Sequence, residues 1–154
     1  MLQDLDKRIA AVSTYDEYLA LYRSLSESKR TDLFDPLWNL AIRERWDGRR
    51  AIASFFLVGI DPPAPRGCGE LLNELANAAW DLSNKVVAFY LVTQFGRACV
   101  LTAIEKALGR GTDSAQKVKL EGVAYWARMP AADLVEPLHY FVWEEAIEGK
   151  AHDA

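Results

Sequence analysis

Cysteine and histidine are scarce in this sequence, which removes most metal and nucleophilic chemistry. There are two of each among 154 residues. Neither His139 nor His152 lies in a metal-ligand spacing such as His-Glu-x-x-His. Cys68 and Cys99 have no metal-ligand spacing and no catalytic signature around them, so we expect two reduced thiols and no disulfide. We therefore predict no metal, no cofactor and no enzymatic activity.

Long apolar runs are also missing. The longest, residues 51–60 and 86–92, are too short to span a bilayer. Asp4 and Asp6 stand where a signal peptide has positive charge. These features predict a cytoplasmic protein without a membrane-spanning segment.

Positive charge is in the minority. Eighteen Lys and Arg residues stand against 22 Asp and Glu, for a net charge of -4. Such a chain is poorly suited to hold phosphate backbones, so nucleic acid is a disfavoured partner. The densest basic cluster lies near Trp46 and is interrupted by acids; we interpret it as a solvated turn, with nucleic-acid contact as the alternative. Its members are Arg43, Arg45, Arg49 and Arg50.

What the sequence does contain is helical periodicity. Hydrophobic residues make up 51% and charged residues 26%, which is typical of one globular domain, here residues 1–150 with a disordered tail at 151–154. Thr14 with Glu17 predicts a capping box, and Asp35 before Pro36 predicts an N-cap followed by proline at the first helical position. Apolar spacing predicts helices over residues 14–28, 35–46, 70–80, 98–108, 114–129 and 133–148, with 2–12 as an N-terminal cap.

Two further segments, Arg49 to Ile60 and Asn84 to Phe95, are apolar enough to be helix or strand. No other segment offers an alternating partner strand, and two isolated strands make a poor sheet. Their length also favours helix. We therefore predict an all-α domain of about eight or nine helices.

The helix starts recur at a regular spacing. Tyr15, Arg50, Lys85 and Lys117 each begin a mainly apolar helix, at intervals of 35, 35 and 32 residues. Each is followed by a second helix, which predicts four antiparallel hairpins. The run 84–92, a polar start leading into an apolar helix, resembles the inner helices of HEAT or armadillo-like repeats. That resemblance implies a short solenoid-like stack; an irregular helical bundle is the alternative.

The last predicted helix has an unusual charge pattern. From Met129 to Gly149 there is no Lys or Arg. On a helical wheel the side opposite the apolar face carries acids with aromatics among or beside them, which suits a basic protein partner. The alternative is that Trp143 packs inside and the acids merely solvate an edge helix. The predicted partner-binding residues are Glu136, Tyr140, Trp143, Glu144 and Glu148.

In general character, a compact acidic helical protein with such a face resembles bacterial immunity or antidote proteins, although no motif matches residue by residue. The resemblance implies a non-enzymatic protein-binding module that neutralises a basic, nuclease-type toxin by occluding its active site. The alternative function is a nucleic-acid-binding helical-repeat protein, such as a DNA-base-processing enzyme, that uses the four arginines. A third hypothesis is an enzyme with Cys68 as nucleophile, because Arg66 is adjacent and a helix begins there. The sequence leaves the oligomeric state open.

Overall fold

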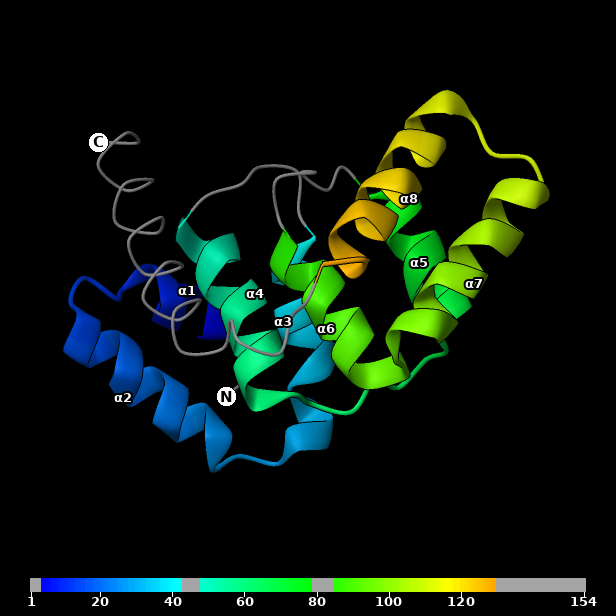
Figure 1. Ribbon diagram of the computed structural model, residues 1–154. Helices are drawn as coiled ribbons and strands as arrows, with labels where there is room; N and C mark the ends of the chain where they lie inside the picture. The colour runs from blue at the N-terminus through cyan, green and yellow to red at the C-terminus, as the bar shows by residue number, and fades with distance from the viewer. Residues whose placement is uncertain (1–3, 43–47, 79–84, 130–154) are drawn as a thin grey trace.

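The computed structural model describes residues 4–42, 48–78 and 85–129. For residues 48–51 it describes the backbone only. All regular structure in these ranges is helical (Figure 1), which confirms the all-α prediction. A 3-10 turn, Arg30–Asp32, precedes α3. The α-helices are α1 Leu5–Ala10, α2 Tyr15–Ser26, α3 Phe34–Ala41, α4 Gly48–Ile60, α5 Cys68–Asn77, α6 Lys85–Phe95, α7 Arg97–Gly109 and α8 Ser114–Ala127.

The two segments that could have been strands are the helices α4 and α6. Helix α6 is buried at every residue from Val86 to Leu91. A helix that is apolar all round must be covered on all sides. Helices α4, α7 and α8 provide that cover.

Side-chain caps set the starts of α2 and α8. Thr14 Oγ1 accepts from the Glu17 N–H at 3.2 Å, as predicted. The Glu17 carboxylate does not close the box on Thr14 but accepts from the N–H of Ser13 at 2.9 Å. At α8 the box is complete: Asp113 accepts from the Gln116 N–H at 2.8 Å, and the Gln116 side chain accepts from the Asp113 N–H at 3.2 Å. Both devices satisfy N–H groups that have no acceptor within the helix.

The predicted start of α3 was wrong. Asp35 is not the N-cap; the helix begins at Phe34, so Pro36 is its third residue. The 3-10 turn already places Leu33 in the helical region, and both Leu33 and Phe34 are buried. Proline is tolerated there because first-turn N–H groups have no intrahelical acceptor. The predicted end of this helix, at residue 46, lies outside the described residues.

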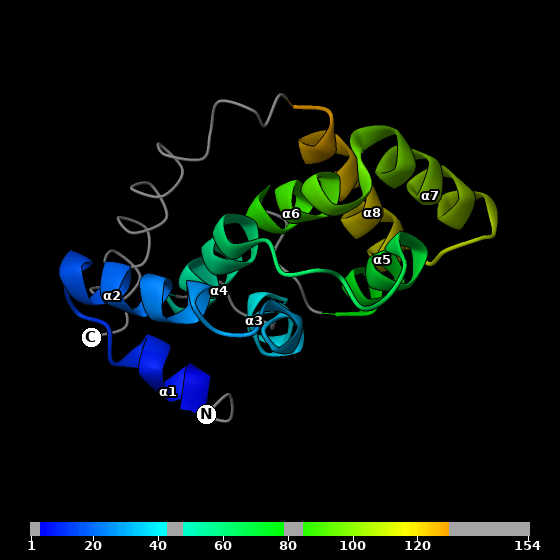
Figure 2. The same ribbon diagram turned by 90° about the horizontal axis from the view of Figure 1, so that it is seen from below.

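Alternate helices stack in series. Helices α2, α4, α6 and α8 pack each on the next. They contain the four predicted helix starts, but α4 begins at Gly48 and α8 at Ser114, so the intervals between starts are 33, 37 and 29 residues and the predicted regular period is not kept. On one side α3 runs along α4, and at the other end α5 and α7 pack on each other and on α8 (Figures 1 and 2). Two of the predicted hairpins were wrong: neither α2 with α3 nor α4 with α5 is a closely packed pair. Helix α3 packs on α4 instead, and α5 packs on α7 and α8.

One aromatic-rich core runs through the stack. Tyr18 stacks on Phe56 with ring centroids 5.4 Å apart, and Phe34 on Trp38 at the same distance. Tyr90 joins the second pair, 5.8 Å from Phe34. This core fixes the helices whose outer faces are described next.

Among the described residues no single helix is long and apolar enough to cross a membrane. Helices α6 and α7 together have the necessary length and apolarity, but they are bent by 111° where they join.

Candidate functional site

The predicted partner-binding residues, Glu136, Tyr140, Trp143, Glu144 and Glu148, lie outside the described part of the chain, as does the whole predicted helix 133–148. Arg43, Arg45 and Trp46 also lie outside it. Arg49 and Arg50 are in the first turn of α4, but their side chains are not described. The acidic-aromatic face and the basic cluster therefore remain predictions.

A different feature stands out on the surface of α8. Val118 is 51% exposed and Tyr125 56% exposed, and in the described ranges no other large hydrophobic side chain is as open. Val118 and Tyr125 are seven residues apart, which is about two helical turns, so both lie on one face of α8. We call this face the α8 stripe; it consists of Ser114, Val118, Glu121, Tyr125 and Arg128, all exposed.

The Tyr125 ring is held in place from below. Its edge meets the Trp126 ring with centroids 4.9 Å apart and planes at 75°. Trp126 is packed against the core, and the Lys85 ammonium lies 5.9 Å from its ring centroid. Further along the stripe, Glu121 faces Lys117 at 3.9 Å. Tyr125 is thus an exposed aromatic whose ring contacts one partly buried neighbour, Trp126. The carboxylate of the stripe, Glu121, is paired with Lys117.

The sequence predicted a helix over residues 114–129 and not the stripe. Val118 and Tyr125 lie outside the apolar set Leu120, Val123 and Ala124 that faces the core. Their spacing from that set is visible in the sequence, but which side of α8 the neighbouring helices cover is decided by tertiary packing.

The second feature is a cavity of about 540 Å³ between the start of α5 and the face of α7. Both cysteines line it: Cys68, the first residue of α5, is buried, and Cys99, in the first turn of α7, is exposed. Both are free thiols, and Cys99 is close enough to Cys68 to raise its pKa. The other lining residues are Gly69, Ala98, Thr102, Ala103, Lys106 and Arg110.

Burial raises the pKa of the Cys68 thiol to about 11, and the contact with Cys99 adds to the effect. Arg66, whose proximity in sequence suggested a reactive cysteine, is engaged elsewhere. Its Nε and Nη2 donate to Glu74 at 2.9 and 3.1 Å, and Nη2 lies 3.0 Å from Asp35. Cys68 is therefore protonated at neutral pH and buried, which disfavours it as the nucleophile that attacks an external substrate.

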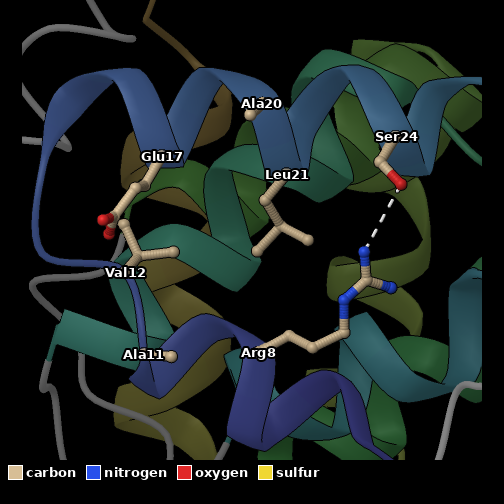
Figure 3. Close-up of a pocket in the computed structure, with 7 residues that line it drawn as sticks. All are labelled: Arg8, Ala11, Val12, Glu17, Ala20, Leu21 and Ser24. Carbon is tan, nitrogen blue, oxygen red and sulfur yellow. Dashed lines mark hydrogen bonds between the residues drawn. The ribbon is translucent and has the colours of Figure 1, made fainter.

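A second hollow, of about 500 Å³, lies between α1 and α2 (Figure 3). Arg8 reaches across from α1 and donates to Ser24 Oγ at 3.4 Å, while Leu21 points from α2 toward α1. The Glu17 carboxylate at its rim accepts from Ser13. Its lining is mostly apolar, and we interpret it as a seam between two packed helices.

Nothing in the described ranges brings together three or more His, Cys, Asp or Glu side chains able to hold a metal ion. No family model, curated protein or solved structure matches this chain.

Proposed function

We propose that this chain is a non-enzymatic protein-binding module that binds its partner through the α8 stripe and through the predicted acidic-aromatic residues Glu136, Tyr140, Trp143, Glu144 and Glu148. The observation that carries the proposal is the exposure of Tyr125 and Val118 on one face of α8. Covering two such side chains gains roughly 25 cal/mol for each Å² of apolar surface removed from water. A partner that docks on the stripe gains this energy.

The support beneath Tyr125 favours binding further. Tyrosine is one of the usual interface hot spots, since it buries a large ring and keeps a polar tip. Ordering a free side chain at an interface costs about 0.5–1.5 kcal/mol. Because Trp126 already restrains the Tyr125 ring, much of that cost is met before the partner arrives.

Charge selects the partner. Residues 129–149 contain no Lys or Arg but do contain Glu136, Glu144 and Glu148. A surface of one sign speeds capture of a partner of the other sign. We therefore propose that α8 supplies the apolar anchor and the segment after it supplies the charge, so that the partner is a basic protein.

In being compact, acidic and all-helical, this chain resembles bacterial immunity or antidote proteins. We extend the proposal to that class: the chain covers the active site of a basic, nuclease-type toxin by steric and electrostatic occlusion. No covalent step is involved. Tyr125, Tyr140 and Trp143 fill pockets, and the three glutamates meet Lys or Arg of the toxin.

The test is co-purification of the tagged full chain from its native host at low salt, with the bound protein identified by mass spectrometry and then titrated in purified form. We expect a strongly basic partner whose affinity falls as salt rises. Replacing Tyr125 and Val118 together by serine should weaken binding by at least tenfold, as expected for an interface hot spot. Ala115→Ser, exposed on α8 but off the stripe, should leave the affinity unchanged.

The charge contribution has a matched control. Glu136, Glu144 and Glu148 changed together to glutamine should weaken binding. The same change at the exposed Glu27, Glu70 and Glu105 alters net charge equally and should have a much smaller effect. Equal effects, an acidic partner, or no partner would contradict the proposal. A DNA gel shift at low salt, lost when the four arginines become glutamine, would favour nucleic-acid binding instead.

A further inference from the structure

The sequence has two cysteines, and the fold brings them together from helices far apart in the chain. Cys68 begins α5 and Cys99 lies in the first turn of α7, and these helices pack against each other. Both side chains line the 540 Å³ cavity, and Cys99 is close enough to Cys68 to raise its pKa. Cys99 is open to solvent and Cys68 is buried behind it. One accessible thiol thus has a second thiol within reach.

The rest of the cavity carries positive charge. Cys99, Ala103, Lys106 and Arg110 follow one another at steps of four, three and four along one face of α7. Lys106 and Arg110 are exposed. None of the described residues that line the cavity is Asp or Glu. A ligand that reaches the thiols along this wall therefore meets two cations and no carboxylate.

The volume is also informative. Ligand sites occupy about 300–1,000 Å³, so the cavity has room for a small organic molecule. What distinguishes it from the hollow of similar size between α1 and α2 is its lining of two thiols and two cations. We propose that Cys68 and Cys99 form a redox pair that exchanges thiols for a disulfide with a small anionic disulfide of the glutathione class bound against Lys106 and Arg110. This site is separate from the α8 stripe and does not rest on the protein-binding proposal.

The exchange takes two steps. Cys99 loses its proton to solvent, and its thiolate attacks one sulfur of the bound disulfide; a protein–ligand S–S bond forms, the ligand S–S bond breaks, and one ligand thiolate leaves and takes up a proton. Cys68 then loses its proton and its sulfur attacks Cys99 Sγ, which expels the second ligand thiol. In balance, the two cysteines lose two electrons and two protons, and the ligand disulfide is reduced to two thiols.

The difference in burial determines which cysteine attacks the ligand disulfide first. Attack requires an accessible thiolate, and Cys99 is the exposed member of the pair. Cys68 is buried and lines the same cavity as Cys99, so it resolves the mixed disulfide and does not form it. The reverse reaction, with the reduced ligand, returns both thiols.

The experiment incubates the reduced full chain with oxidised glutathione and follows intact mass and thiol content. We expect the loss of two hydrogens, a peptide cross-link between residues 68 and 99, and complete reversal by dithiothreitol. Cys68→Ser should stop at a mixed disulfide on Cys99, and Cys99→Ser should stay unmodified. Circular dichroism checks that each variant is folded, and Cys68→Ala replaces Cys68→Ser if the buried hydroxyl unfolds the chain.

The cations are tested with Lys106→Gln and Arg110→Gln together. The ratio of the rate with oxidised glutathione to the rate with neutral hydroxyethyl disulfide should fall about fivefold or more, since one charge–charge contact at 4 Å in water is worth about that factor. An unchanged ratio would overturn the anionic-ligand assignment. A stable mixed disulfide in the wild type, disulfide-linked dimers, or a Cys99→Ser variant modified at Cys68 would overturn the redox pair.

Discussion

Gly59 of α4 lies directly beneath the ring of Tyr22 of α2. A Cβ at this position would be 2.9 Å from Tyr22 Cε2 and 3.1 Å from Phe55 Cε1. We therefore expect Gly59→Ala to destabilise the protein by about 1–2 kcal/mol, the overpacking cost less the gain in helix propensity. Chemical denaturation measures this change.

Gly109, the last residue of α7, is the matched control. A Cβ there meets nothing within 4 Å, so Gly109→Ala should leave stability unchanged or raise it by up to about 1 kcal/mol. In a Tyr22→Leu background, Gly59→Ala should lose most of its cost. If it is equally destabilising there, the contact with Tyr22 is not its cause.

The helices themselves were predictable because helix formation is read from local pattern. The lack of any alternating partner segment was enough to predict that α4 and α6 are helices. The start of α3 was not predictable from Asp35 and Pro36, because the burial of Leu33 and Phe34 and the preceding 3-10 turn outweigh a local capping signal. Which helix packs on which, such as α3 on α4, depends on the loops, and hairpin order does not determine it.

The candidate sites were less predictable. The exposure of Tyr125 follows from which side of α8 meets α5, α6 and α7, and a single helix does not specify this. Contact between Cys68 and Cys99 is a property of two helices packed together, since no local spacing joins positions so far apart in sequence. The adjacency of Arg66 to Cys68 suggested a reactive thiol, but tertiary packing directs the guanidinium to Glu74 and Asp35.

Arg66 links the start of α5 to α3. Its two-pronged bond to Glu74 and its contact with Asp35 use the planar geometry of the guanidinium, and it also lies 5.3 Å from the Phe34 ring centroid. We expect Arg66→Lys to lower the free energy of unfolding by about 1–2 kcal/mol, because lysine keeps the charge but not the paired bonds.

The control for this pair is Glu121→Gln, which breaks the 3.9 Å ion pair with Lys117 between side chains more than half exposed. That change should cost no more than about 0.5 kcal/mol. Equal losses for the two variants in urea denaturation would show that the geometry of Arg66 contributes nothing beyond its charge.

Tyr90 makes a buried hydrogen bond. Its hydroxyl donates to the Pro62 carbonyl at 2.7 Å, and the side chain is fully buried. Tyr90→Phe leaves that carbonyl without its partner, so we expect a loss of about 1–3 kcal/mol in thermal or chemical unfolding. Tyr125→Phe removes the same atom from an exposed ring and should change stability by less than about 0.5 kcal/mol. A Tyr90→Phe protein as stable as the wild type would mean that the bond adds nothing.

The Cys68 thiol should make stability fall at alkaline pH. Its pKa rises from an ordinary value near 9.0 to about 11 in the folded protein, chiefly through burial. Between these values the unfolded chain has released the proton and the folded chain still holds it, so the folded state binds more protons and the free energy of unfolding decreases as pH rises. The contribution is fully present below pH 9 and is lost as pH approaches 11.

Burial also raises the pKa of Tyr18 and Tyr90, which lowers alkaline stability in the same direction. The thiol contribution is therefore measured as a difference: denaturation under reducing conditions at several pH values from 8 to 11, wild type against Cys68→Ala. The wild-type curve should fall more steeply than that of the variant between pH 9 and 11, while the two run parallel below pH 9. Parallel curves over the whole range would show that Cys68 ionises alike in the folded and unfolded chains, and that its burial does not hold the proton.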